Sequence, residues 1–203
     1  MKIIGISGVA GAGKDFFFEN LNKKIKCKRF SLGDELKKEI RSYCLQSFNI
    51  DPTICSREEK NLIRPCLVSH ALIKRKTTEG RYWIEKTDIH IKNHIFEQVK
   101  SGSMNEYSCI TDIRYNQYEK DEVYWLKKEL NGILIHVSQF TIAANKKRIF
   151  VPPANEEEAS QNESLKREAD YVIECEKFTG SQDKIQNLYY QMVIKPFLKF
   201  IKK

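Results

Sequence analysis

The sequence has little of several features that mark particular protein classes. Its 203 residues include only 9 glycines, 5 prolines and 3 methionines, with no internal repeat and no low-complexity tract. No apolar run approaches the roughly 18 residues that a membrane-spanning helix needs, and no signal-peptide pattern is visible. These absences argue against fibrous, repeat and membrane-embedded proteins, and we expect a globular cytoplasmic domain without a membrane partner.

Disulfide and zinc frameworks are also poorly supported. Six cysteines are present, but none belongs to a C-x-x-C pair. Scattered thiols predict buried small side chains in a reducing compartment. His90 and His94 have the four-residue spacing of zinc ligands on a helix, but no third ligand is near them in the sequence. Zinc binding is therefore the weaker interpretation.

The net charge of +8 has two interpretations. It can serve nucleic-acid binding, or it can attract small anionic substrates while the other lysines solvate the surface. The lysines are spread over the whole chain, with no long basic block. This distribution favours small phosphorylated substrates, and nucleic acid stays the less favoured alternative.

A glycine-rich segment near the start of the chain is the strongest motif. It follows the apolar run Ile3–Ile6, precedes a predicted helix, and matches the P-loop pattern G-x-x-x-x-G-K. Glycines let backbone N–H groups surround an anion, while the lysine adds a full positive charge. The residues that we expect to bind ATP are Gly8, Val9, Ala10, Gly11, Ala12, Gly13, Lys14 and Asp15. Asp15 stands where Ser or Thr usually holds magnesium.

Hydrophobic periodicity predicts alternating strands and helices. The predicted strands are Ile3–Ser7, Lys28–Leu32, Tyr107–Thr111, Ile133–Val137 and Tyr171–Glu174. The predicted helices are Lys14–Lys24, Gly33–Ser47, Arg57–Lys74, one through Trp83 that ends near Gly102, Gln117–Leu130, and one that begins at Ser181 or Gln182. This order predicts a single α/β domain over residues 1–203, with a doubly wound, five-stranded parallel sheet.

Two further segments bear on function. Gln139–Glu168 is polar, contains prolines and has little strand signal, so we interpret it as a mobile lid. Asp112 and Arg114 follow an apolar strand, at the edge of a parallel sheet where ligands bind. A carboxylate and a guanidinium at that edge suit magnesium and phosphate.

These motifs together resemble a known group of kinases. The motifs are the P-loop followed by Asp15, the segment Phe30–Lys37, Arg64, the segment Gly80–Trp83, the segment Thr111–Arg114, and the pair His136-Val137. In this order they resemble the phage and viral deoxynucleoside monophosphate kinases. The animal-type phosphomevalonate kinases share the layout.

The resemblance implies an adenylate-kinase-like P-loop fold, with ATP and Mg²⁺ as cofactors. It implies catalytic roles for Lys14, Asp112, Arg114 and Arg148. It implies magnesium contacts for Asp15 and Asp112. The acceptor phosphate and its substrate would face Lys37, Arg64, Arg81, Trp83 and Arg114. Lys146, Lys147 and Arg148 would be lid cations.

The leading hypothesis is a nucleoside monophosphate kinase, with small-molecule nucleotides as partners. A phosphomevalonate-type kinase, a non-catalytic nucleotide-binding protein and a nucleic-acid end kinase are the alternatives. The resemblance also allows a phage- or virus-encoded protein that acts in a host cytosol. Homodimerisation is a hypothesis that the sequence leaves open.

Overall fold

The computed structural model describes residues 2–102 and 107–202. Within these ranges the strands are β1 (Lys2–Ser7), β2 (Cys27–Phe30), β3 (Tyr107–Ile110), β4 (Ile133–Ile142), β5 (Arg148–Phe150) and β6 (Tyr171–Glu176). The helices are α1 (Lys14–Asn22), α2 (Leu32–Phe48), α3 (Arg57–Thr77), α4 (Arg81–Ser101), α5 (Glu122–Tyr124), α6 (Glu156–Glu168), α7 (Gln182–Tyr189) and α8 (Lys195–Ile201), with π-helical η1 (Trp125–Glu129) and η2 (Tyr190–Ile194). None of these helices is long and apolar enough to cross a membrane.

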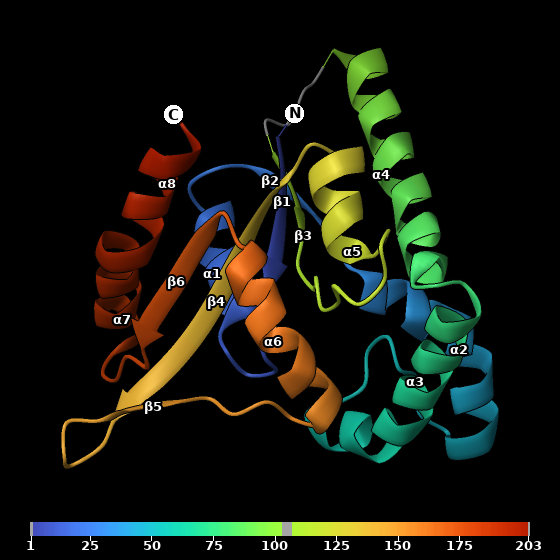
Figure 1. The fold of residues 1–203 in the computed structure, drawn as a ribbon, viewed down its shortest axis with the longest axis horizontal. Coiled ribbons are helices and arrows are strands. Elements are labelled where there is room, and N and C mark those ends of the chain that lie inside the picture. The colour runs from blue at the N-terminus through green and yellow to red at the C-terminus, as the bar shows by residue number, and fades with distance from the viewer. Residues whose placement is uncertain (1, 103–106, 203) are drawn as a thin grey trace.

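The strands form one mostly parallel sheet with helices on both faces (Figure 1). Five strands run parallel in the order β2-β3-β1-β4-β6, which confirms the predicted doubly wound α/β sheet. The chain runs outward from β1 to β2, returns to β3, and then crosses to β4 on the other side of β1. Ligands of such sheets bind at the carboxyl ends of the strands where this reversal occurs. Gly8 and Asp112 lie at those ends.

A sixth strand, β5, was not expected from the sequence. Phe140 in β4 pairs with Phe150 of β5 and also with Glu176 of β6, so β5 and β6 occupy opposite edges of β4. Strand β5 therefore uses the edge of β4 that β1 leaves after Ser7. This places the connection after β4 next to the glycine-rich segment.

The predicted lack of strand structure in Gln139–Glu168 is wrong. Its first residues extend β4 to Ile142, Arg148–Phe150 forms β5, and α6 completes the segment. The alternation of polar and apolar residues from Gln139 to Ile142 suits an extended strand and could have shown this. The mobility of the segment stays a prediction.

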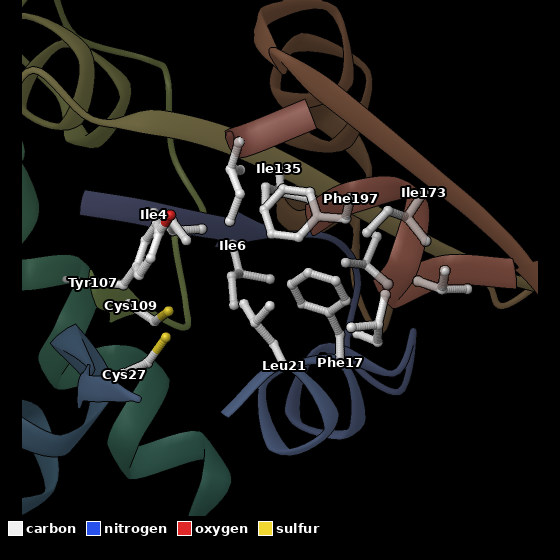
Figure 2. Close-up of a cluster of buried hydrophobic side chains, with 14 of the residues drawn as sticks. Ile4, Ile6, Phe17, Leu21, Cys27, Tyr107, Cys109, Ile135, Ile173 and Phe197 are labelled. Atoms are coloured by element: carbon white, nitrogen blue, oxygen red, sulfur yellow. The ribbon is translucent and has the colours of Figure 1, made fainter. Parts of the chain in front are cut away.

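One face of the sheet is covered by α1 and the C-terminal helices. Figure 2 shows Phe17 and Leu21 of α1 against Ile6 of β1, with Phe197 of α8 nearby. Phe17 and Phe197 are fully buried, and their rings meet edge to face at a centroid distance of 5.3 Å. This core fixes α1 directly behind the loop that follows β1.

The opposite face is covered by α2, α4, η1 and α6. Its core includes Ile84 and Ile91 of α4, Trp125 of η1 and Leu165 of α6. A smaller apolar cluster joins α2 to α3 through contacts that include Ile40 and Ile63. Helices α2, α3 and α4 thus form a layer beside the carboxyl ends of β1 and β3.

The predicted helix Gln117–Leu130 begins later than expected, at Glu122. The reason is Asp121, which is fully buried and accepts a hydrogen bond from the Glu122 backbone N–H as the N-cap. The same carboxylate also accepts from the backbone N–H groups of Gln117 and Tyr118. The segment before Glu122 is therefore held as a loop, because Asp121 satisfies the amides of Gln117 and Tyr118 outside a helix.

A single carboxylate connects the three helices of this layer. Glu39 of α2 accepts hydrogen bonds from His70 of α3 at 2.8 Å and from the Tyr82 hydroxyl of α4 at 2.6 Å. It also forms ion pairs with Lys86 at 2.7 Å and Lys74 at 3.7 Å. Despite the cost of burial, these partners lower the pKa of Glu39 to about 2.

Candidate functional site

The loop after β1 has the backbone geometry of an anion cradle. Gly8, Gly11 and Gly13 have φ values of 132°, 81° and 90°, which side-chain-bearing residues rarely adopt. A Cβ at Gly8 would lie 2.2 Å from the Val137 carbonyl oxygen, so no other residue fits there. Gly13 is the N-cap of α1 and brings no side-chain cap, which leaves the first amides of the helix available to an anion.

Lys14 is folded back against this loop. Its Nζ donates hydrogen bonds to the carbonyl oxygens of Gly8 at 2.6 Å and Val9 at 2.9 Å, and its exposed fraction is 9%. Burial, together with the neighbouring charge of Arg114, lowers the pKa of Lys14 to about 8. The lysine is thus a desolvated cation within the cradle, positioned to neutralise bound phosphate.

Asp112 connects β3 to the start of α2. Its carboxylate accepts hydrogen bonds from the Ser31 hydroxyl at 2.8 Å and from the backbone N–H groups of Leu32 at 2.9 Å and Gly33 at 2.7 Å. These contacts fix the positive end of α2 beside the loop, since carboxylates stabilise helix N-termini. Sequence reasoning predicted a magnesium role for Asp112 and did not foresee this positioning role.

A cavity of about 220 Å³ extends from the loop to helices α2 and α3. Its walls combine cationic, acidic and apolar groups. Its lining includes Gly8, Ala10, Leu32, Gly33, Leu36, Lys37, Lys60, Arg64, Leu67, Val68, Ala71, Arg75, Trp83, Asp112, Arg114, Tyr115, Glu122, Ala154, Asn155, Glu157, Glu158, Asn162 and Leu165. The carboxyl-end loops of the sheet and one face of α3 therefore share one cavity.

Positive charge is concentrated on the walls that α2, α3 and the loop after β3 contribute. Lys37, Lys60, Arg64 and Arg114 line the cavity. Burial lowers the pKa of Lys60, and the nearby charges of Lys37, Arg64 and Arg114 lower it further. Cations that lie this close together repel one another, and an anion bound among them relieves the repulsion.

A buried ionic cluster supports the floor of the cavity. Arg75, which is 3% exposed, forms ion pairs with Asp121 at 2.9 Å and Glu122 at 3.3 Å. Its guanidinium lies 3.5 Å from the centre of the Tyr115 ring. Glu122 also accepts hydrogen bonds from the backbone N–H groups of Arg114 and Tyr115. Burial raises the pKa of Glu122 to about 8, against the opposing charge of Arg75.

The structure brings together most, but not all, of the predicted acceptor residues. Lys37, Arg64, Trp83 and Arg114 line the cavity. Trp83 is 4% exposed, so it serves the core as well as the cavity wall. Arg81 is not among the lining residues; it forms paired hydrogen bonds of 2.8 and 3.0 Å with Glu129. The predicted acceptor contact of Arg81 stays a prediction, because Glu129 holds Arg81 away from the cavity.

The predicted lid cations also lie away from this cavity. Lys146, Lys147 and Arg148 are exposed and are absent from its lining. Arg148 forms an ion pair of 3.3 Å with Glu174 of β6 and lies over the Phe140 ring. A catalytic role for Arg148 stays a prediction that would require the segment to move.

Sequence reasoning missed Lys60, Arg75 and Glu158 as site residues. A signal for the first two was present, because residues 60, 64, 67, 71 and 75 follow helical spacing on one face of α3. No local pattern distinguished Glu158 from its neighbours Glu156 and Glu157. Its contacts with the loop join positions that are about 150 residues apart.

The site is suited to magnesium only together with a phosphate ligand. Within residues 2–102 and 107–202, no group of three or more His, Cys, Asp or Glu side chains could hold a metal ion. His90, one of the two histidines with zinc-ligand spacing, contacts Glu35 at 3.2 Å. Magnesium keeps several waters and is often shared with substrate phosphates, so the predicted pair Asp15 and Asp112 remains a chemically suitable set.

Comparisons with known proteins find only distant likenesses. No protein-family model matches the sequence, and no curated protein matches it by sequence. Among solved structures, the chain is similar to TT1252 from Thermus thermophilus, with 15% identity, TM-score 0.44, and coverage of 98% of this chain and 96% of that chain. It is also similar to dephospho-CoA kinase from Campylobacter jejuni, with 16% identity, TM-score 0.43, and coverage of 100% and 98%. Shikimate kinase from Acinetobacter baumannii in complex with shikimate has 13% identity and TM-score 0.40, with coverage of 97% and 94%. Likenesses this distant carry no argument about substrate.

Proposed function

We propose that this protein transfers the terminal phosphoryl group of ATP to a nucleoside monophosphate. The observation that carries the proposal is the shared cavity. Its walls include both the glycine-rich loop and the cations Lys37, Lys60, Arg64 and Arg114 of α2, α3 and the loop after β3. A phosphate donor and a phosphate acceptor can therefore face each other within one space, which phosphoryl transfer requires.

The reaction follows from these groups. An oxygen of the acceptor phosphate attacks the terminal phosphorus of ATP, and the bond to the bridging oxygen breaks to release ADP. A phosphate monoester is largely ionised at neutral pH, so no general base is needed. Lys14 and the loop amides would stabilise charge on the donor, and Arg64, Lys37 and Arg114 would hold the acceptor.

Apolar groups beside the cations favour a nucleotide as acceptor. Leu36, Leu67, Val68 and Trp83 line the same cavity, which gives a base or sugar a surface to contact. Asp15 and Asp112 are the carboxylates that would hold Mg²⁺ through water, and the ion would neutralise the phosphate charge when bound. Deoxynucleotides are the preferred class, in line with the sequence resemblance.

The test is an ATP-consumption screen with purified protein. The acceptors are the ribo- and deoxyribonucleoside monophosphates, mevalonate 5-phosphate, and an oligonucleotide with a free 5′-hydroxyl. We expect turnover with at least one nucleoside monophosphate. Turnover with mevalonate 5-phosphate or the oligonucleotide alone would replace this proposal with the corresponding alternative. A protein that binds ATP and turns over none of them would be a nucleotide-binding protein without this activity.

A further inference from the structure

Glu158, in the first turn of α6, contacts the glycine-rich loop. Its Oε1 accepts a hydrogen bond of 2.9 Å from the Ala10 backbone N–H. Its Oε2 accepts one of 2.7 Å from the Ala154 backbone N–H. The Arg114 guanidinium lies 3.8 Å from Oε1, and the side chain is only 16% exposed. A carboxylate thus receives amide and guanidinium donors beside a phosphate-binding loop.

The oxygen atoms of Glu158 occupy the position of an anionic ligand. A carboxylate and a phosphoryl group both accept hydrogen bonds from backbone N–H groups and from arginine. The Ala10 amide belongs to the glycine-rich loop, and Arg114 belongs to the cation wall. The carboxylate therefore stands in for a phosphate oxygen between these two groups.

Its place within the cavity indicates which phosphate it replaces. Gly8 and Ala10 line the cavity, whereas residues 11–14 of the loop are not among its lining residues. Ala10 is therefore on the side of the loop that faces the acceptor. The donor phosphate on that side must be the terminal one, because it is the group that reaches the acceptor.

We propose that Glu158 occupies the subsite of the transferable phosphoryl group and is displaced when ATP binds. This inference rests on the proposed phosphoryl-transfer function. The terminal phosphate would take over the Ala10 amide and the Arg114 guanidinium, and its negative charge would repel the carboxylate. ADP lacks that phosphate and leaves Glu158 in place.

The displacement has a consequence for the acceptor. Ala154, Asn155, Glu157 and Asn162 line the cavity and lie next to Glu158 in the chain. Movement of Glu158 away from Ala10 would therefore change the wall that meets the acceptor. Binding of ATP and binding of the acceptor would therefore influence each other through the first turn of α6.

The test compares three variants by titration calorimetry. Glu158→Gln keeps the shape but removes the charge, and Glu158→Ala removes the contacts. Glu156→Gln is the matched control, because Glu156 is in the same helical turn and does not line the cavity. The probes are a non-hydrolysable ATP analogue, ADP and inorganic triphosphate. All are measured at a pH below the Lys14 pKa of about 8.

We expect Glu158→Gln and Glu158→Ala to bind the ATP analogue and triphosphate about tenfold more tightly than the wild type, since a competing charge-assisted hydrogen bond is lost. Their ADP affinity should stay within about twofold, which is the precision of such comparisons. Glu156→Gln should match the wild type for every probe. Thermal unfolding of each variant confirms that the fold is retained.

Three results would overturn the inference. The first is unchanged or weaker analogue binding in both Glu158 variants. The second is an equal gain for ADP and the analogue. The third is weaker analogue binding only when Mg²⁺ is present, which would make Glu158 a magnesium partner. The Glu158 variants could bind triphosphate more tightly while the protein turns over no acceptor. That result would refute the proposed function, and the inference about Glu158 would stand.

Discussion

The two ends of the cavity are built in different ways. The proposed donor end is the glycine-rich loop, of which Gly8 and Ala10 line the cavity and whose shape depends on glycines at fixed positions. The acceptor end collects side chains from α2, α3 and the loop after β3. Backbone geometry specifies the first, and tertiary packing specifies the second. A short stretch of sequence can therefore reveal a phosphate donor site, whereas an acceptor site depends on contacts between distant segments.

The largest expected effect tests how far the acceptor end depends on packing. Arg75→Met would leave Asp121 buried without its counter-charge and should lower the free energy of unfolding by about 3–5 kcal/mol. Denaturant unfolding measures the loss. Arg81→Met is the matched control, because the Arg81–Glu129 pair is much more exposed. It should cost no more than about 1 kcal/mol. Equal losses of unfolding free energy in the two variants would show that the buried Arg75 ion pairs stabilise the fold no more than the exposed Arg81 pair.

The second effect breaks the donor end while leaving the acceptor end intact. Lys14→Ala should lower kcat by roughly 10²–10³-fold, by analogy with loss of one preorganised charge-stabilising donor. Lys23→Ala, on the exposed end of the same helical region, is the control. Steady-state kinetics and circular dichroism are the measurements. Near-normal turnover in a folded Lys14→Ala protein would rule out the loop as the donor site.

A third substitution separates the two arginines that sequence reasoning grouped together. Arg64→Ala should raise the acceptor KM by about tenfold and change the ATP KM much less, because one charge-assisted hydrogen bond to the acceptor is lost. Arg81→Ala should leave the acceptor KM near the wild-type value, since Glu129 holds that side chain away from the cavity. A larger effect from Arg81→Ala would show that the cavity rearranges around the acceptor.

The smallest effect concerns a buried base beside the donor end. His136 is fully buried, its Nδ1 lies 3.1 Å from the Ser7 hydroxyl, and among the described residues its Nε2 has no hydrogen-bond partner. Burial, together with the charges of Lys166 and Lys14, lowers the pKa of His136 to about 4. The unfolded chain therefore binds a proton first as pH falls, and stability is lost from about pH 6.5 down to about pH 4.

His136→Gln should remove this part of the pH dependence. Between about pH 7 and about pH 6 the difference from the wild type should stay under about 1 kcal/mol and increase at lower pH. Denaturant unfolding at several pH values measures it. Parallel stability curves for the two proteins over the whole range would contradict a neutral buried His136.

The same contrast explains what could be predicted from the sequence. The loop, the helix behind it and the parallel sheet follow from local pattern, because apolar period and glycine positions are local properties. Local pattern does not show whether Arg75 or Arg81 reaches the cavity, because both arginines lie on helices close to the same turn. Their acidic partners, Asp121 and Glu129, decide which of them reaches the cavity.

Two other differences between the predicted and the observed structure also have specific causes. The late start of α5 depends on Asp121, whose carboxylate satisfies loop amides that a helix would otherwise use. The position of Glu158 depends on how α6 packs through Leu165 against the sheet. Neither interaction leaves a periodic signal, because each depends on one side chain and a distant partner.

The Glu39 contacts have a mechanical consequence. His70, Tyr82 and Lys86 each bind the same carboxylate. Separating any two of the helices α2, α3 and α4 therefore disturbs more than one contact. Any displacement of α2 from α3 also strains its connection to α4. The cations that α2 and α3 contribute to the cavity should therefore keep their mutual spacing.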